Sequence, residues 1–478
     1  MKVAIIGMGV AGISVLREWT KKQQETPTIQ VTVFGGTETF GTGQAFQQDA
    51  PDLLMNLPAI SSSMIPEKES DFADWMRDHY GETSPAEKFY ARAQYGEYMN
   101  ERMNEWLIQS NATVVREKVE TIRPLENGQY RLTWKMHEEV FDVVHLCIGN
   151  LPYQDPYDLH NHPHAIQNPF PMKKSISKLP HGATVGVLGT GLTAIDVFRY
   201  TFAYRPDLNV VFFSRSGSFK TIISDAPSFD NQYLTKENIE RYQKEHNGTI
   251  PLKTYLEWFT KELEHHQVSW QEVCQKHTFG SKRSFEQQLQ DPYEIGIIQK
   301  VMKNITFIHT DLWMALTEAD KHLFMKKYYK TWDKLRAPFP PETGENVLYA
   351  WKTNQIQVYD HLEDIKKNEQ SFRCIMKKAE NIEVDYVVNA TGNDLFVSHE
   401  TKERALLQQL LNERILQAEA FGGVQVTVPH LSVISQKHGV MKNFKVHGQL
   451  IAGIQFGNSS VRIISESART AVNHIFID

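Results

Sequence analysis

The sequence reads "VGVLGTGLTAIDVFRY" at residues 185–200, and it opens with the similar stretch "VAIIGMGVAGISVL" at residues 3–16. In each stretch an apolar run of strand type leads into a turn of the form G-x-G-x-x-G or G-x-G-x-x-A, and helical spacing of apolar residues follows. Strand, tight turn and helix in this order are typical of a βαβ unit, in which the helix N-terminus holds the pyrophosphate of a dinucleotide. The repeated pattern predicts two such units.

Length and composition fit a globular protein with at least two domains. The chain has 478 residues, of which 41% are hydrophobic and 23% are charged. Its net charge of -6, from 51 basic and 57 acidic residues, argues against a dedicated nucleic-acid binder. The apolar opening lacks a cleavage site, and no apolar run reaches the roughly 18–20 residues that a membrane span needs. We expect a cytoplasmic protein with no membrane partner.

The reactive residue types exclude several kinds of site. The three cysteines, Cys147, Cys274 and Cys374, are far apart, and no C-x-x-C spacing occurs. We therefore expect neither a disulfide framework, nor a zinc site, nor a redox-active thiol pair. G-x-S-x-G and H-E-x-x-H are also absent from the sequence, and the histidine pairs lack companions at metal-ligand spacing. The sequence predicts no metal.

The first unit departs from the usual pattern after its second strand. The strand "IQVTVF" at 29–34 is followed by Gly35 and Gly36, where a carboxylate that binds the ribose hydroxyls is expected. Glu38 is the nearest acid. This leaves the ribose contact of the first site open.

The second unit has a different residue at the corresponding place. Its second strand, "NVVFFSR" at 209–215, ends in Ser214 and Arg215. An arginine there can pair with the 2′-phosphate of NADPH, and the alternative is a solvated surface side chain.

Three further stretches carry candidate ligand contacts. In "GTGQAF" at 41–46, Gly41 and Gly43 favour a second approach of backbone to a ligand. "LLMNLPA" at 53–59 is too apolar for a plain surface loop: either it lines a flavin ring, with Asn56 as a hydrogen-bonding residue at the flavin edge, or it packs in the core. In "FYARAQYGEYM" at 89–99, Arg92 is a candidate phosphate or flavin contact. Asn56 is the only catalytic candidate that the residues offer.

The rest of the chain divides into helical and strand-rich parts. Residues 234–335 have few strand signals and several helix-like runs. Strand signals return after "RAPFPP" at 336–341, and "YVVNATGN" at 386–393 has the same form as 143–150. We predict an α/β fold with parallel sheets and a helical segment.

Taken together, these motifs resemble the bacterial FAD/NAD(P)-binding oxidoreductases related to the N-hydroxylating flavin monooxygenases. The resemblance also rests on "WDKLRAPFPP" and on "IAGIQFG" at 451–457, and it covers most of the chain. It implies two Rossmann-like domains, with a discontinuous FAD domain and an inserted NADPH domain. The implied boundaries are 1–165 and 346–478 for the FAD domain, and 180–345, including the helical segment 234–335, for the NAD(P)H domain.

The resemblance also implies roles for individual residues. FAD would be bound by Gly7, Gly9, Gly12, Gly41, Gly43, Asn56, Arg92, Gly149, Gly392 and Gly453, with Gly149 and Gly392 where the chain crosses between domains. NADPH would be bound by Gly189, Gly191, Thr193, Ser214 and Arg215.

The chemistry implied is hydride transfer from NADPH to FAD. In the monooxygenase interpretation, the reduced flavin captures molecular oxygen as a hydroperoxide and oxygenates a small amine or amino-acid-like substrate. Two alternatives stay open. One is an NAD(P)H-dependent flavin reductase acting on a small acceptor such as a quinone or an iron chelate. The other is a cofactor-binding redox sensor without turnover.

Overall fold

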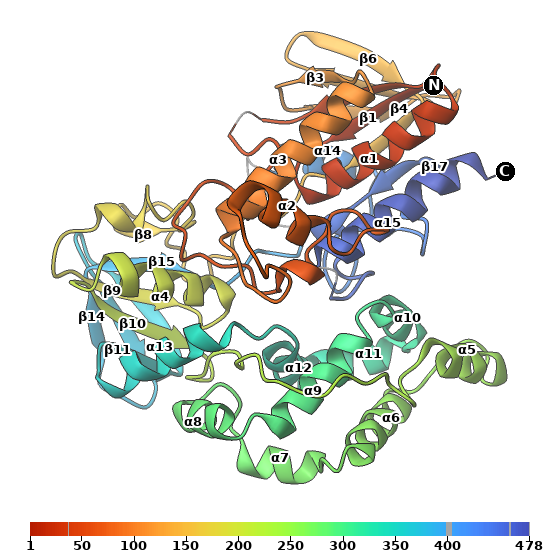
Figure 1. Cartoon of the computed structure of the whole chain (residues 1–478). Helices are drawn as coiled ribbons and strands as arrows, with labels where there is room; N and C mark the ends of the chain where they lie inside the picture. Colours follow the sequence, from red (N-terminus) through yellow and green to blue (C-terminus); the bar gives the residue numbers. More distant parts are fainter. Residues whose placement is uncertain (37, 398–403, 458–459, 478) are drawn as a thin grey trace. The chain divides into compact units, whose positions relative to one another are not determined.

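The computed structural model describes residues 1–36, 38–397, 404–457 and 460–477. The chain divides into two compact units (Figure 1). Unit 1 consists of Met1–Pro152 and Asn393–Asp478, and unit 2 consists of Tyr153–Gly392. One unit is thus inserted in the other along the sequence.

Unit 1 is built on a six-stranded sheet in the order β16-β17-β7-β1-β2-β3. Its strands are β1 (Lys2–Ile6), β2 (Gln30–Phe34), β3 (Thr113–Val115), β7 (Val143–Leu146), β16 (Ser432–Ser435) and β17 (Gly439–Val446). All neighbouring pairs are parallel except β16 and β17. Parallel strands end at the same edge of a sheet, so the loops after β1, β2 and β7 meet there.

Both faces of this sheet are buried, as a parallel sheet requires. Val3 and Ile5 of β1 pack into one hydrophobic cluster, and Ala4 and Ile6 pack into another. The first face is covered by α1 (Val10–Glu25), α3 (Arg92–Gln109) and α15 (Val461–Asn473), with α1 in contact with both others. The second face is covered by α14 (Ala405–Asn412) and by an antiparallel sheet of β4 (Thr121–Pro124), β5 (Tyr130–Trp134) and β6 (His137–Phe141).

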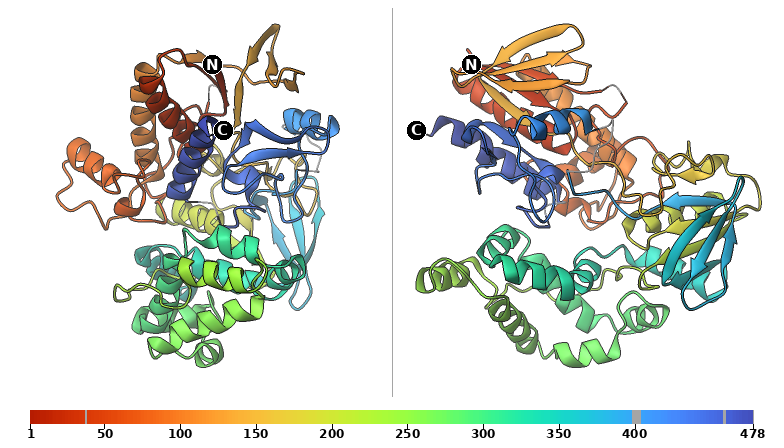
Figure 2. Two further views of the ribbon diagram at one scale, coloured as in Figure 1. Left: turned by 90° about the vertical axis from the view of Figure 1, so that its right-hand side faces the viewer. Right: turned by 180° about the vertical axis from the view of Figure 1, so that it is seen from behind.

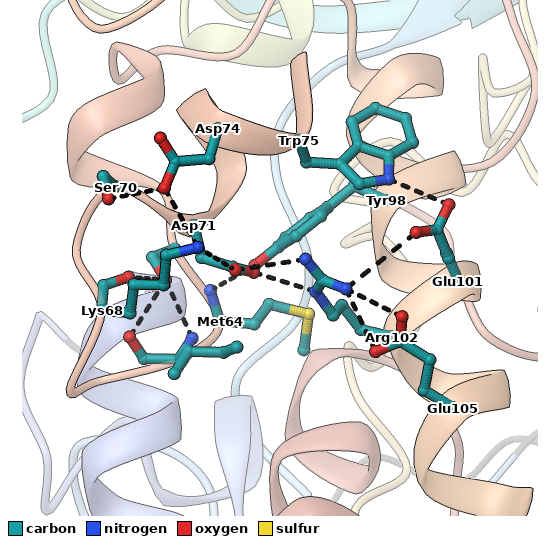
Figure 3. A network of polar contacts seen from close by, with 12 residues as sticks. Met64, Lys68, Ser70, Asp71, Asp74, Trp75, Tyr98, Glu101, Arg102 and Glu105 are labelled. Carbon is teal, nitrogen blue, oxygen red and sulfur yellow. Dashed lines mark hydrogen bonds and ion pairs between the residues drawn. The ribbon is translucent and has the colours of Figure 1, made fainter. Parts of the chain in front are cut away.

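A buried carboxylate fastens α2 (Asp71–Tyr80) to α3 (Figure 3). Asp71 is 2% exposed and accepts hydrogen bonds from Tyr98 Oη at 2.8 Å and from Arg102 Nε and Nη2 at 2.9 and 3.1 Å. The Tyr98 hydroxyl in turn accepts from the Met64 amide at 3.1 Å. These contacts hold residues 62–65 against α3.

Unit 2 contains a five-stranded parallel sheet in the order β11-β10-β9-β15-β8. The strands are β8 (Ala165–Ile166), β9 (Thr184–Leu188), β10 (Asn209–Ser214), β11 (Ile356–Asp360) and β15 (Tyr386–Asn389), and α4 (Leu192–Tyr204) follows β9. An antiparallel sheet of β12 (Leu362–Lys367), β13 (Phe372–Met376) and β14 (Ile382–Val384) packs on one face.

Helices fill the long connection between β10 and β11, as the sequence predicts for 234–335. They are α5 (Lys236–Glu245), α6 (Leu252–His265), α7 (Trp270–Lys276), α8 (Lys282–Gln290), α9 (Tyr293–Asn304), α10 (His309–Ala315), α11 (Glu318–Lys327), α12 (Tyr329–Arg336) and α13 (Pro341–Lys352). Those before α13, drawn in green to teal, lie away from the five-stranded sheet of the same unit, whereas α13 contacts β11 (Figure 2). Short 3-10 helices are η1 (Ala59–Ser61), η2 (Ile176–Lys178), η4 (Gly448–Ile451) and η5 (His474–Phe476).

The division of the chain differs from the predicted return to the first domain at residue 346. Residues 346–392 belong to unit 2, because β11 pairs with β10 and β15 pairs with β9. The two connections between the units run beside each other in both units. The Asp394 amide donates to the Pro152 carbonyl at 2.8 Å, and the Gln154 amide donates to the Gly392 carbonyl at 3.0 Å.

Candidate dinucleotide-binding sites

The first glycine turn leaves a helix N-terminus without a capping side chain. Helix α1 begins after Gly9, at the carboxyl end of β1, and no side chain caps its first turn. A Cβ built on Gly9 would lie 3.6 Å from the Gly43 Cα, which is an ordinary van der Waals contact, so Gly9 and Gly43 lie side by side. The uncapped N–H groups of the first helical turn suit a pyrophosphate.

The other two glycines of this turn allow close packing of backbone. Gly7 has φ +99°, and a Cβ there would lie 2.3 Å from the Cys147 carbonyl oxygen. A Cβ on Gly12 would lie 1.9 Å from the Gly7 carbonyl oxygen. Both glycines therefore bring α1 close to β1 and β7, which places the helix N-terminus at the sheet edge.

The loop at 41–46 runs along the same turn. The Gly41 amide donates to the Met8 carbonyl at 2.7 Å. A Cβ on Gly41 would lie 1.9 Å from Asn100 Oδ1, so this glycine is packed against α3. Gly43, with φ +61°, lies beside Gly9 instead. The structure thus brings Gly9 and Gly43 together and gives Gly41 a packing role.

The segment that precedes Asn56 lies against the start of α3, where Arg92 stands. The Arg92 amide and Nε donate to the carbonyls of Leu53 and Leu54 at 2.8 and 3.2 Å, and the Met55 amide donates to the Tyr90 carbonyl at 2.8 Å. Asn56 Oδ1 is buried, and no described residue donates to it. A buried carbonyl oxygen without a donor is costly, so this atom fits a ligand that brings an N–H or O–H group.

The remaining candidate glycines differ in the space around them. Gly149 and Gly392 have φ +78° and +94°, and a Cβ on either would meet no atom within 4 Å. They stand near the two connections between the units, Gly149 in unit 1 and Gly392 as the last residue of unit 2. Gly453 is different, because a Cβ there would lie 2.4 Å from the Gly422 carbonyl oxygen. Close packing therefore requires a glycine at this position.

An arginine lies near the position where a ribose-binding carboxylate is expected after β2. Glu38 is exposed, and the Gly35 amide donates to the Val115 carbonyl at the end of β3 at 3.1 Å. The next residue, Arg116, lies over the ring of Phe40, with 3.5 Å between its guanidinium carbon and the ring centroid. The sequence analysis missed this pair, whose signal is an arginine directly after the third strand.

The second glycine turn repeats the geometry of the first. A Cβ on Gly189, with φ +122°, would lie 2.3 Å from the Ala390 carbonyl oxygen at the end of β15. Helix α4 begins after Gly191 without a side-chain cap, and a Cβ on Gly191 would meet nothing within 4 Å. Thr193 lies in the first turn of this helix. Side chains cap α5, α7, α8 and α11, namely Thr235, Ser269, Ser281 and Thr317, whereas α6, α9 and α10 also begin without a side-chain cap. What sets α4 apart is that its uncapped start is a glycine turn at the carboxyl end of β9.

The end of β10 presents a polar side chain and a cation. Ser214 Oγ accepts from the Gly217 amide at 2.9 Å, which closes a turn around Arg215. Arg215 is exposed. Burial raises the pKa of Tyr329 on α12, and the charge of Arg215 opposes this rise, so the two side chains lie within electrostatic range. Ser214 and Arg215 therefore stand at the same sheet edge as Gly191 and face α12.

Other reactive groups offer less. Cys147, Cys274 and Cys374 are free thiols. Asp155, Asp158 and His160 have ligand atoms within 4.8 Å of one another, but Asp158 is already paired with Lys367 at 3.0 Å and both Asp158 and His160 are exposed. In the described part of the chain, no helix combines the length and apolar character that crossing a membrane requires.

Unit 1 also buries a group of basic side chains. Trp19 Nε1 donates to His145 Nε2 at 2.9 Å, so the proton of the neutral His145 ring is on Nδ1. His145 Nδ1 then donates to His447 Nε2 at 2.9 Å. Lys445 Nζ lies 3.0 Å from His474 Nδ1. Burial lowers the pKa of Lys445 to about 7 and the pKa values of His447 and His474 to about 3 and 4. The three histidines are therefore uncharged at neutral pH, whereas Lys445 is partly protonated there.

Comparison with known proteins supports the fold. Residues 4–151 match a protein family described as FAD-NAD(P)-binding. No curated protein matches the sequence. Among solved structures, the chain is similar to the ornithine hydroxylase PvdA from Pseudomonas aeruginosa, with 12% identity, 99% of each chain covered and a TM-score of 0.62. It is also similar to the L-lysine 6-monooxygenase from Pseudomonas syringae, with 14% identity, 99% of this chain and 98% of the other covered, and a TM-score of 0.61.

A reductase shares the same architecture. The bacillithiol disulfide reductase Bdr (YpdA) from Staphylococcus aureus is 11% identical, with 99% of this chain and 98% of that chain covered and a TM-score of 0.52. These likenesses confirm the predicted fold class and its resemblance to FAD/NAD(P)-binding oxidoreductases. At such low identity they concern the fold, so the chemistry has to be argued from the sites.

Proposed function

We propose that this protein is an FAD-dependent, NADPH-oxidising monooxygenase that adds oxygen to the nitrogen of a small amine or amino-acid-like substrate. One observation carries the proposal. Each unit has a helix that starts at a glycine, without a capping side chain, at the carboxyl edge of a parallel sheet. Two separate sites for two dinucleotides are what a flavoprotein that oxidises a nicotinamide needs.

FAD is assigned to unit 1. The N–H groups after Gly9 bind its pyrophosphate, and Gly43 leaves room for it. From there the loop 41–46 follows α3, and the Phe46 carbonyl packs against Gly96 of that helix. The path ends at Arg92 in the first turn of α3 and at the neighbouring segment that carries Asn56. FAD bound along this path would bring a donor to Asn56 Oδ1, which would accept a hydrogen bond from it. Gly149 gives open space at the carboxyl end of β7.

NADPH is assigned to unit 2. Gly191 and Thr193, at the first turn of α4, would hold its pyrophosphate, and Arg215 would contact the 2′-phosphate. When both coenzymes are bound, they supply hydride transfer and the activation of oxygen. The protein orients the two rings and excludes water, which requires no acid–base pair of side chains.

The substrate class is inferred from the similar structures named above, an ornithine hydroxylase and a lysine 6-monooxygenase. Both names describe amino acids with a side-chain amino group. A side-chain amine is nucleophilic when it is uncharged, so it can accept an oxygen atom at nitrogen. We therefore assign this chain a small primary amine, and diamines and basic amino acids are the first compounds to test.

The experiment uses purified protein with FAD, NADPH and ¹⁸O₂. We expect a yellow protein that oxidises NADPH, consumes oxygen and gives an amine product whose mass rises by one ¹⁸O atom. A panel of ornithine, lysine, putrescine and cadaverine covers the substrate class. A colourless protein that binds no added FAD would overturn the proposal outright.

A reductase is the second candidate, because a disulfide reductase shares the fold. If NADPH oxidation proceeds with quinone or ferric chelate as the acceptor, and no amine gains oxygen, the reductase interpretation replaces the monooxygenase. If the protein binds FAD but oxidises NADPH with none of the acceptors, the result would instead favour the redox sensor. Since the three cysteines are free thiols, we do not assign a dithiol relay.

A further inference from the structure

Four oxidisable aromatic side chains form a continuous row through the interior of unit 1. Tyr95 and Tyr98 of α3 are both fully buried, and their ring centroids lie 5.4 Å apart. The ring of Tyr98 lies 5.8 Å from that of Trp75 on α2, and Trp75 lies 5.7 Å from Tyr80 at the end of the same helix. Tyr80 is 45% exposed, so the row leads from the core to the surface. We call Tyr95, Tyr98, Trp75 and Tyr80 the aromatic row.

The inner end of the row lies beside the loop that is assigned to FAD. The ring of Phe46 packs against Tyr95 with 4.7 Å between centroids, and the Phe46 carbonyl packs against Gly96. Arg92 precedes Tyr95 by about one helical turn on α3. Since this loop and Arg92 belong to the proposed flavin path, the row starts beside that path and leads away from it.

The two buried tyrosines differ in what their hydroxyl groups contact. Tyr95 Oη donates to the Ser62 carbonyl at 2.7 Å, and a carbonyl is too weak a base to take the proton. Tyr98 Oη donates to the Asp71 carboxylate at 2.8 Å (Figure 3). Burial raises the pKa of both phenols, so each keeps its proton at neutral pH. Of the two, Tyr98 has the base that can take this proton when the ring loses an electron.

The two outer members of the row also donate to carboxylates. Trp75 Nε1 donates to Glu101 Oε2 at 3.0 Å (Figure 3), and Tyr80 Oη donates to Glu97. Burial, followed by the bond to Glu97, raises the pKa of Tyr80 to about 12. A phenol or indole that loses an electron becomes far more acidic. A carboxylate on its O–H or N–H group therefore lowers the free energy that the oxidation costs, because it accepts the proton.

Packing of the core does not require such carboxylates. Unit 2 buries a comparable group of rings, in which Phe219 contacts Phe285 and Trp351, and Phe285 contacts Phe339. Three of these four rings are phenylalanines, which need no hydrogen-bond partner. In the aromatic row, by contrast, Asp71 is buried at 2% exposure, and burying a carboxylate is costly. The acids beside the row therefore point to a role in proton transfer.

We propose that the aromatic row conducts oxidising equivalents away from the flavin, so that a radical formed there is reduced from the surface before it damages the site. The inference rests on the proposed function, because it needs a flavin that activates oxygen along the path past Phe46. When activated oxygen is not transferred to a substrate, oxygen-centred radicals are the one-electron oxidants that such a site forms. Removing them is a way of excluding competing reactions. The electron comes from a thiol in solution.

Each step moves one electron inward along the row, and the proton of an oxidised ring moves to the carboxylate that it contacts. At the inner end the radical X• takes an electron from Tyr95 and a proton from water, and becomes XH. Tyr95 is then reduced by Tyr98, Tyr98 by Trp75, and Trp75 by Tyr80, and each carboxylate returns its proton when its ring is reduced. At the surface a thiol RSH reduces the Tyr80 radical, releases its proton to water and becomes RS•. The sum is X• + RSH → XH + RS•.

Flash photolysis of the FAD-loaded protein without oxygen tests the row independently of NADPH and substrate. A flavin excited by blue light is a one-electron oxidant, so it replaces the radical X•. In the wild type we expect a tyrosyl or tryptophanyl radical that outlives the flash and that added glutathione removes, because Tyr80 is exposed. Trp75→Phe and Tyr80→Phe should each abolish this effect of glutathione, because the rings that remain oxidisable are buried. Transient absorption measures the radical and its decay.

Controls separate electron transfer from folding. Trp106→Phe removes a buried tryptophan of α3 that lies outside the row, and it should leave the radical and its removal by glutathione unchanged. Tyr80→Trp keeps an oxidisable ring at the exposed end and should restore the effect of glutathione, which a purely structural defect would not show.

The proposal is overturned if glutathione removes the radical equally fast in the wild type, Trp75→Phe and Tyr80→Phe. It is also overturned if the wild type binds FAD and forms no lasting radical. If the same FAD-loaded protein oxygenates an amine in either case, only this inference fails. A protein that binds no FAD would overturn the proposed function and this inference together.

Discussion

Gly9→Ala should weaken FAD binding while leaving the fold intact. Gly9 has φ -96°, which alanine adopts without strain, and its new Cβ would make an ordinary contact of 3.6 Å with Gly43. The loss of a glycine N-cap costs under about 1 kcal/mol of unfolding free energy. The methyl group would, however, stand between the N–H groups of α1 and a pyrophosphate. Losing one charge-assisted hydrogen bond of about 1.5–3 kcal/mol weakens FAD about ten- to a hundredfold.

Gly12→Ala is the matched variant with the opposite expectation. Its Cβ would lie 1.9 Å from the Gly7 carbonyl oxygen, so α1 must move by about 1.5 Å to reach the 3.4 Å of ordinary contact. Such overpacking costs about 3 kcal/mol and lowers the unfolding midpoint of the apoprotein. Urea unfolding and fluorescence titration of the apoprotein with FAD measure both quantities. If Gly9→Ala binds FAD within about threefold of the wild type, the pyrophosphate does not lie at this helix and the assignment is wrong.

Three further predictions concern single residues. Arg215→Ala should weaken NADPH about ten- to a hundredfold and leave NADH nearly unchanged, in binding titrations; equal losses would show that Arg215 does not read the 2′-phosphate. Asp71→Asn should lower the free energy of unfolding by about 3 kcal/mol, because it leaves the guanidinium of Arg102 without its buried partner, and an unchanged urea midpoint would contradict this. The pKa of Lys445 is about 7 in the folded chain against 10.5 when unfolded, so the unfolded chain binds more protons between these values and stability should rise with pH from about 7 to 10. Lys445→Met should flatten that rise in urea midpoints, and an undiminished slope would assign it to other groups.

The periodic parts of the fold could be predicted from the sequence. A glycine turn between an apolar strand and an amphipathic helix is a local pattern, so both βαβ units and the helical segment at 234–335 could be recognised without long-range information. The same pattern predicts Gly9 and Gly191, and the role proposed for them depends on backbone groups in their own turn.

What the sequence could not show depends on distant partners. Gly41 and Gly453 look like ligand glycines, but each is packed against an atom far along the chain, Asn100 Oδ1 and the Gly422 carbonyl respectively. The predicted end of the inserted unit, at residue 345, is too early. Strand β11 belongs to this unit because it pairs with β10, and the local sequence does not indicate that pairing. The approach of Lys334 to Ser218 likewise joins residues more than a hundred positions apart.

The paired connections at 152–154 and 392–394 affect how the two units can be expressed as separate proteins. Because Asp394 is hydrogen-bonded to Pro152, and Gln154 to Gly392, each unit has its two cut ends side by side. A short glycine-serine bridge from Pro152 to Asn393 would therefore close unit 1 without stretching it, and Tyr153–Gly392 could be expressed as a free-standing cassette. Swapping that cassette between homologous genes becomes a practical route to exchanging the coenzyme preference of one enzyme for that of another.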